Sequence, residues 1–199
     1  ANAPASIKTT LEQEQKEAKF DIAINFFNQA KTYIDRGKNA VNAARAETMT
    51  KAIKAFTALR SDESTEIGWL ANAWLMKCSM ETTDPENVVK YHKLVMDRQK
   101  EPAVQPAVRL VRYFAMQDMT IARPDEPETI GNFALAPKKP KMTPMDRLRK
   151  VQQDGEAWLK AYPNYHRTYE GQGVRYELGH AYIADAFEAK DPKVSRSTV

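Results

Sequence analysis

Residues 176–187 read YELGHAYIADAF, and within them Leu178, Gly179 and Tyr182 form the pattern L-G-x-x-Y. A glycine in such a stretch belongs either to a ligand-binding loop or to one helix of a repeated array. Val174, Leu178 and Tyr182 recur every four residues, which is the spacing of one face of a helix. The stretch is therefore predicted to be helical, and we next ask whether the pattern repeats.

A leucine, a small or slim residue, and an aromatic residue four positions after the leucine occur together at three places in the chain. The first two places are 40 residues apart and the last two are 68 apart, of which 23 belong to an insertion over residues 121–143. A period near 40 residues made of two helices is typical of a helical solenoid. The small residue lets a neighbouring helix approach closely, while the other two fill the groove on either side. The three places are Leu70-Ala71-x-x-Trp74, Leu110-Val111-x-x-Phe114 and Leu178-Gly179-x-x-Tyr182.

This pattern resembles the tetratricopeptide repeat (TPR) family, whose first helix carries W-x-x-L-G-x-x-Y. The match covers Leu178, Gly179 and Tyr182, whereas Arg175 stands in the place of the tryptophan. The resemblance spans about residues 20–190 and its motifs are degenerate. It implies an all-α fold: a right-handed α-solenoid of about four antiparallel helical hairpins, forming a single TPR-like domain over residues 1–199. Only KVSRSTV follows the last helix, so we expect the native chain to continue beyond Val199 and complete the repeat.

Composition agrees with a helical protein. Hydrophobic residues make up 42% of the chain and charged residues 28%, and there are only seven glycines. The net charge of +4 is mild, and a nucleic-acid-binding protein usually has a denser basic stripe.

No apolar run is long enough to span a membrane, since the nearest, over residues 67–76, is interrupted by Asn72. The first residues, ANAPAS, resemble a mature N-terminus after signal-peptide removal or an artificial boundary, so we expect export to a bacterial periplasm, with the cytoplasm as the alternative.

Helix boundaries follow from capping residues and prolines. Thr65 or Ser64 can cap one helix, Asp84 followed by Pro85 starts another, and Thr143–Pro144 starts a third. Gly37 is placed to end the first helix. The predicted helices cover residues 7–36, 40–60, 65–81, a segment from residue 85, a segment from about residue 106 to 121, residues 144–162, and residues 168–189.

The insertion over residues 121–143 is rich in proline and cannot be a regular helix. It combines an acidic DEPE with a basic PKKPK, and Phe133 and Leu135 would be its apolar anchors. Six positive residues against Asp146 alone lie between residues 138 and 150. The segment is either a docking strap for a partner or a solvated tether. The six residues are Lys138, Lys139, Lys141, Arg147, Arg149 and Lys150.

No motif predicts catalysis, a metal or a cofactor. The three histidines, His92, His166 and His180, lack the spacing of a zinc hydrolase. The single cysteine, Cys78, is expected in the core. The stretch EGQGVR over residues 170–175 could hold an anion at a helix start, but it lacks the strand and the Lys-Ser/Thr of a phosphate loop. We therefore expect no catalytic, metal-binding or cofactor-binding residues in this chain.

The resemblance instead implies a non-enzymatic interaction scaffold or a structural subunit of a larger assembly. Such arrays hold a peptide or a helix of a partner in a concave groove lined by the first helices of successive repeats. Helix register places six polar or aromatic residues on that groove, and the insertion adds four. The predicted partner-binding residues are Asn72, Lys77, Arg109, Arg112, Phe133, Leu135, Lys138, Lys139, Arg175 and Tyr176.

Two alternatives remain at the level of sequence. The basic segment over residues 138–150 could bind nucleic acid or another acidic partner, with a strong salt dependence. The mild net charge and the absence of interleaved aromatic residues argue against nucleic acid. Alternatively, the chain could be the helical-repeat part of a larger enzyme whose catalytic domain lies elsewhere.

Overall fold

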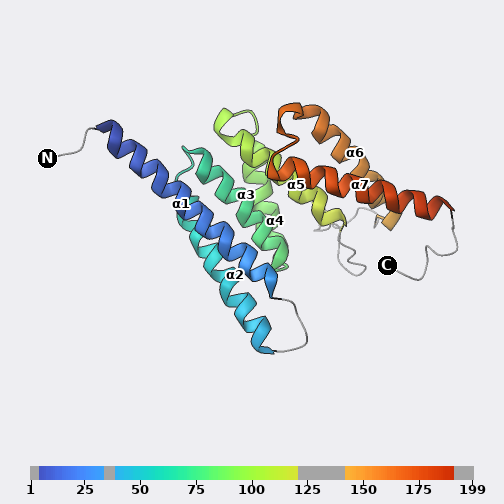
Figure 1. Cartoon of the computed structure of the whole chain (residues 1–199), viewed down its shortest axis with the longest axis horizontal. Coiled ribbons are helices and arrows are strands. Elements are labelled where there is room, and N and C mark those ends of the chain that lie inside the picture. The colour runs from blue at the N-terminus through green and yellow to red at the C-terminus, as the bar shows by residue number, and fades with distance from the viewer. Residues whose placement is uncertain (1–4, 34–38, 121–141, 191–199) are drawn as a thin grey trace. The chain divides into compact units, whose positions relative to one another are not determined.

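The computed structural model describes residues 5–33, 39–120 and 142–190, and these form seven α-helices and two short 3-10 helices without any strand. The chain divides into two compact units, Ala1–Ala107 and Val108–Val199. Figure 1 shows the helices and their order. The all-α prediction is confirmed. The single repeat domain over residues 1–199 stays a prediction.

The first unit is built from helices that follow one another in antiparallel pairs. In chain order, α1 lies beside α2, α2 beside α3, and α3 beside α4 (Figure 1). Short connections force this arrangement, because a chain that turns within a few residues must return along the helix it has just left. The bounds are α1 Ala5–Thr32, α2 Asn39–Leu59, α3 Glu66–Glu81, α4 Pro85–Asp97 and the 3-10 helix η1 Pro102–Val104.

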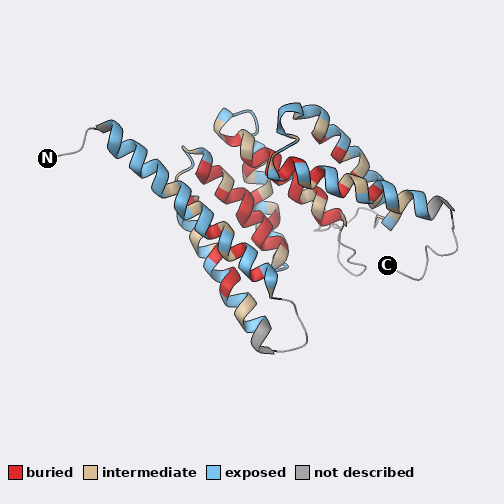
Figure 2. Cartoon of the chain, in the orientation of Figure 1, coloured by how far each residue is buried: buried red, intermediate tan, exposed pale blue. Residues whose placement is uncertain are grey.

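The central element of this unit is α3, which is buried along most of its length (Figure 2). Apolar residues occur almost all the way round this helix, so neighbours must cover it on several sides. Phe56 of α2 stacks on Trp74 of α3 with ring centroids 5.8 Å apart. Two residues of α1 complete the cluster: Phe27 contacts Trp74 at 5.2 Å, and Phe20 contacts Phe56 at 5.7 Å. These four rings fasten α1 and α2 to α3.

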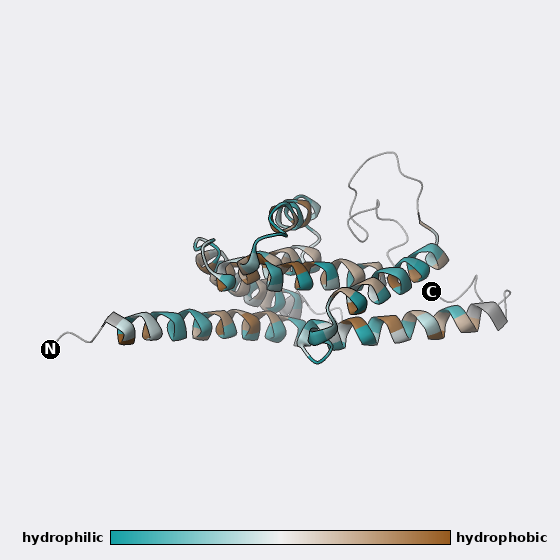
Figure 3. Ribbon diagram, turned by 90° about the horizontal axis from the view of Figure 1, so that it is seen from above, coloured by the Kyte–Doolittle hydropathy of each residue, from teal (hydrophilic) through white to brown (hydrophobic). Residues whose placement is uncertain are grey.

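The N-terminal part of α1 contrasts with this core. Residues 6–15 are all exposed, and Figures 2 and 3 show this end of the helix as solvent-facing and largely hydrophilic. The Lys16 ammonium then bonds the Asp62 carboxylate in the turn between α2 and α3 at 2.6 Å. From that point onward α1 alternates between buried and exposed positions, as an amphipathic surface helix does.

Three of the predicted helix starts are confirmed by their capping bonds. The Thr65 hydroxyl accepts a hydrogen bond from the Gly68 amide at 3.2 Å, and Asp84 accepts one from the Asn87 amide at 3.1 Å. At the start of α6, Thr143 and Asp146 satisfy each other's backbone amides in a capping box. The first helix ends at Thr32, before the predicted residue 36. Gly37 and residues 121–141 of the insertion lie outside the described residues.

The second unit contains most of α5, together with α6, η2 and α7. The boundary between the units falls in the first turn of α5. Helices α6 and α7 pack side by side as an antiparallel hairpin (Figure 1). Gly155 of α6 permits this approach, because a Cβ there would stand 3.3 Å from Leu178 of α7. The bounds are α5 Gln105–Thr120, α6 Pro144–Ala161, η2 Pro163–Tyr165 and α7 Tyr169–Lys190.

The aromatic cluster of the first unit gives a first prediction. Phe56 is fully buried, so Phe56→Ala removes a ring that contacts α1 and α3 and leaves a cavity. The free energy of unfolding is expected to fall by about 3–5 kcal/mol. Ile22→Ala, at a position that is 51% exposed on α1, should change it by less than about 0.5 kcal/mol. Urea denaturation of the two variants measures both values, and equal losses would contradict the packing described.

Candidate interaction surface

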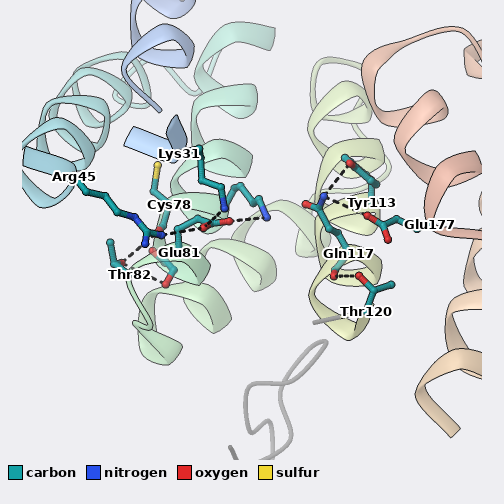
Figure 4. Close-up of polar contacts among 11 residues, drawn as sticks. Lys31, Arg45, Cys78, Glu81, Thr82, Tyr113, Gln117, Thr120 and Glu177 are labelled. Atoms are coloured by element: carbon teal, nitrogen blue, oxygen red, sulfur yellow. Dashed lines mark hydrogen bonds and ion pairs between the residues drawn. The ribbon is translucent and has the colours of Figure 1, made fainter. Parts of the chain in front are cut away.

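A buried carboxylate at the end of α3 collects three cations in the first unit. The Lys77 ammonium lies 3.1 Å from Oε1 of Glu81, and the guanidinium of Arg45 lies 3.7 Å from Oε2. Lys31 of α1 donates to the same Oε2 (Figure 4). The side chains of Lys77 and Glu81 are both buried, so this cluster lies inside the fold. It joins α1, α2 and α3.

The protonation of Glu81 is set by this cluster. Burial alone would raise the pKa of the carboxyl group, because it removes water from the charged form. The positive charges of Lys77 and Lys31, with their hydrogen bonds, outweigh that effect, and the pKa of Glu81 falls below its ordinary value of 4.5. Glu81 is therefore ionised at neutral pH.

Arg109 has a comparable internal role in the second unit. Its Nε donates to Oε1 of Glu170 at 3.1 Å, and its guanidinium lies over the ring of Tyr165, 3.7 Å from the centroid. The indole N–H of Trp158 donates to the backbone carbonyl of Arg109 at 3.1 Å. Arg109 therefore ties α5 to α6, η2 and the start of α7.

A second polar contact joins α5 to α7 about two turns further along. The amide of Gln117 donates to the hydroxyl of Tyr113 at 3.2 Å and to Oε1 of Glu177 at 3.4 Å (Figure 4). Glu177 and Tyr113 are both buried. Burial raises the pKa of the Tyr113 hydroxyl, and the neighbouring Tyr169 and Glu177 raise it further, so the group stays protonated.

The structure corrects the expected exposure of three predicted partner-binding residues. Asn72, Lys77 and Arg109 are buried, and each bonds inside the fold, Asn72 through its amide to the Gly68 carbonyl at 3.1 Å. Helix register failed for Asn72 and Lys77 because α3 is covered on nearly all sides, so a polar position on it does not imply a solvent-facing groove. Arg109 lies on α5, where its pairing with Glu170 and Tyr165 encloses it.

The other predicted residues fall into two groups. Arg112, Arg175 and Tyr176 are exposed in the second unit, with Arg112 lying 5.8 Å from the centroid of the Tyr162 ring. Four residues of the insertion lie outside the described residues, so their role stays a prediction: Phe133, Leu135, Lys138 and Lys139.

The basic segment over residues 138–150 is described only from residue 142. There Lys150 pairs with Asp154 at 2.5 Å, and Asp146 is engaged by Thr143 at the helix start. Arg149 is exposed and Arg147 is half-buried. The described part of the segment is thus an ordinary charged helix surface, which adds nothing in favour of a nucleic-acid site.

The largest exposed apolar residues of the second unit lie along one side of α7. Tyr169, Tyr176 and Ile183 are seven residues apart and Phe187 follows after four, so they form one stripe on the helix. Their exposed fractions are 57%, 63%, 58% and 71%. The opposite side of α7 carries the buried residues that face the rest of the unit. We call this stripe the α7 outer face: Tyr169, Tyr176, Gly179, His180, Ile183 and Phe187.

Gly179 differs from the other described glycines in having no close neighbour. A Cβ at Gly68 or Gly171 would stand 2.0 Å from a backbone oxygen, and at Gly173 it would stand 2.3 Å from the Tyr113 ring. A Cβ at Gly179 would meet nothing within 4 Å. Glycine inside a helix costs roughly 1 kcal/mol relative to alanine, and among the residues that the structure describes no close approach compensates for that cost at Gly179.

This finding corrects the packing expected from the repeat pattern. In the first two places the small residue and the aromatic residue are buried, as Ala71 with Trp74 and Val111 with Phe114 show. At the third place Gly179 is open and Tyr182 is 44% exposed, its hydroxyl bonded to Glu156. Tyr176 and Arg175 were predicted from the sequence, whereas Tyr169, Ile183 and Phe187 were not, although their helical spacing places them on the same face as Tyr176.

The described residues contain no group of three His, Cys, Asp or Glu side chains arranged to hold a metal ion. Burial raises the pKa of the Cys78 thiol to about 12, so this cysteine is protonated at neutral pH. Over the described ranges, none of the helices is both long and apolar enough to cross a membrane. Comparison with known proteins adds no relative: no protein-family model, curated protein or solved structure matches the chain.

The Glu81 cluster gives a second prediction. Because the folded-state pKa of Glu81 is depressed, its stabilisation is present above the unfolded pKa near 4.5 and is lost as the pH falls through the folded value. Glu81→Gln should cost about 3 kcal/mol at pH 7 and should flatten the loss of stability below pH 4.5. Urea denaturation between pH 3 and 7 measures both effects.

The control for that experiment is Glu47→Gln. Glu47 pairs with Lys51 on an exposed face of α2, where solvent weakens the attraction. This variant should leave the stability at pH 7 almost unchanged. A similar loss in both variants would contradict the internal role assigned to Glu81.

The open position of Gly179 gives a third prediction. Gly179→Ala should raise the free energy of unfolding of the monomeric chain by about 0.5–1 kcal/mol, because helix propensity improves and no atom obstructs the methyl group. Gly171→Ala in the same helix should lower it by about 1–3 kcal/mol, since its methyl group would overlap the Tyr165 carbonyl. Thermal and urea unfolding at low protein concentration distinguish the two directions.

Proposed function

We propose that this chain is a non-enzymatic protein–protein interaction subunit, with the α7 outer face as its docking surface. The observation that carries the proposal is the row of exposed aromatic and aliphatic residues along one helix. Contiguous exposed apolar surface of several hundred Å² is uncommon on monomeric proteins and marks interaction sites. Tyrosine is well suited to such a surface, because its ring packs while its hydroxyl remains hydrated.

The proposed architecture is the right-handed TPR-like α-solenoid. Three antiparallel helix pairs support it: α1 with α2, α3 with α4, and α6 with α7. Repeat arrays of this kind bury their ends with a capping element or another chain, because an uncapped repeat leaves an apolar face in water. The exposed α7 outer face has the character of such an uncapped end, which favours a role as a subunit of an assembly.

Site-specific photo-crosslinking tests this function. A benzophenone amino acid is placed at Tyr176 on the α7 outer face, or at Leu11 on the exposed part of α1 as the control, and the chain is expressed in cells that naturally produce it. The two positions are 63% and 50% exposed, so they sample solvent comparably. A discrete protein adduct at position 176 and none at position 11 is the expected result. Adducts with nucleic acid only, or none at either position, would overturn the proposal.

A further inference from the structure

We propose that the α7 outer face binds the same face of a second copy of this chain, with the two α7 helices crossing at Gly179. This inference rests on the proposed function, since it names the partner of the same surface. Two-fold dimers are the commonest oligomers of soluble proteins, and their interfaces are self-complementary. Three properties of the face favour a second copy: its open glycine, its charge and its area.

The open glycine marks the place of closest approach. Among the described glycines, Gly68, Gly155, Gly171 and Gly173 each face an atom of their own chain that a Cβ would crowd. Gly179 carries the same cost of glycine in a helix, but a Cβ there would have no described neighbour within 4 Å. A helix from another chain that crosses α7 here would supply the missing neighbour, because a residue without a side chain lets two backbones come unusually close.

Gly179 also lies near the middle of the stripe from Tyr169 to Phe187. A two-fold axis close to Gly179 relates residues at equal distances on either side of it. Tyr176 of one copy would then lie against the partner's Ile183, and the reverse contact would form at the same time. The bulky apolar residues flank the crossing point on both sides, so they pack around it while the glycines meet at its centre.

The charge of the face favours a second copy over an acidic or basic partner. Among the α7 side chains that the structure describes, Arg175 is the exposed charged residue beside the stripe, whereas Glu170 and Glu177 are buried on the other side of the helix. A face that must meet itself cannot carry several charges of one sign, because they would repel across the two-fold axis. A face for a charged partner would instead present a cluster of one sign. The described part of the α7 outer face lacks such a cluster, as a self-complementary face requires.

The area of the face is sufficient for a dimer. An aromatic side chain offers about 150–250 Å². With exposed fractions between 57% and 71%, the four apolar residues therefore present roughly 500 Å² per copy. Two copies bury roughly 1,000 Å² of apolar surface, and homodimer interfaces are about two-thirds apolar. The total interface would be roughly 1,500 Å², within the range of stable specific interfaces.

Sedimentation equilibrium of the full chain tests the inference. The monomer has a mass of 22.6 kDa, and a dimer of twice that mass is expected at micromolar concentration. Ile183→Glu places a charge within the apolar contact beside the crossing point and should weaken the dimer by at least about thirty-fold. The matched control is Ile22→Glu, at an isoleucine of similar exposure on α1, which should leave the dimer unchanged.

Gly179→Ala provides a variant that cannot be explained by misfolding. It is expected to stabilise the single chain, as argued above, and yet to weaken the dimer by about ten-fold or more, because its methyl group would separate the crossing helices. Circular dichroism confirms the fold of every variant before sedimentation.

The outcomes separate the two proposals. A chain that is monomeric at 100 µM, or a dimer that Ile183→Glu leaves intact, overturns the self-association. If the chain is monomeric but a different protein is crosslinked at Tyr176, the interaction function stands and the second copy is replaced by that partner. A monomer without any crosslink at Tyr176 overturns both.

Discussion

The burial of α3 is the constraint on which the first unit depends. This helix is apolar almost all the way round, so it is stable only when α1, α2 and α4 cover it. The stacked pair of Phe56 and Trp74 supplies much of that cover, and Phe20 and Phe27 extend it to α1. The same burial explains the Glu81 cluster: a carboxylate at the enclosed end of α3 requires cations from the neighbouring helices to remain charged.

The second unit relies on close contacts between helices rather than on one enclosed helix. Glycines at positions 155, 171 and 173 allow backbones and rings to approach where any side chain would obstruct them. Arg109 then joins α5 to η2 and α7 through its pairs with Glu170 and Tyr165. These contacts occupy one side of α7 and leave its other side to solvent. Tyr169 packs its ring on Tyr113 and Tyr176 packs on His180, but more than half of each side chain remains exposed, and this exposed surface supports an interaction role.

The predicted partner-binding residues divide between the surface and the interior of the fold. Tyr176 and Arg175 were predicted on a surface and are exposed, whereas Asn72, Lys77 and Arg109 were predicted on the same surface and are buried. The difference has a physical cause. Helix register states which residues share a face, but exposure depends on the neighbours that surround the helix. α3, which carries Asn72 and Lys77, has neighbours on most sides, and Arg109 of α5 is enclosed by Glu170 and Tyr165. The L-G-x-x-Y pattern likewise predicted close packing at Gly179, where the described part of the chain places no atom within 4 Å of a Cβ.

The sequence by itself determined the helical class and most of the helix boundaries. Capping residues such as Thr65, Asp84 and Thr143 act within one turn, so local chemistry is enough to place them. Tertiary structure alone decided which polar residues are enclosed and which apolar residues remain exposed. Burial depends on contacts between segments far apart in the chain, such as Lys31 with Glu81 or Arg109 with Glu170. No local pattern encodes those contacts. Residue spacing places Ile183 and Phe187 on one face of α7, but only the packing of the second unit decides that this face is exposed.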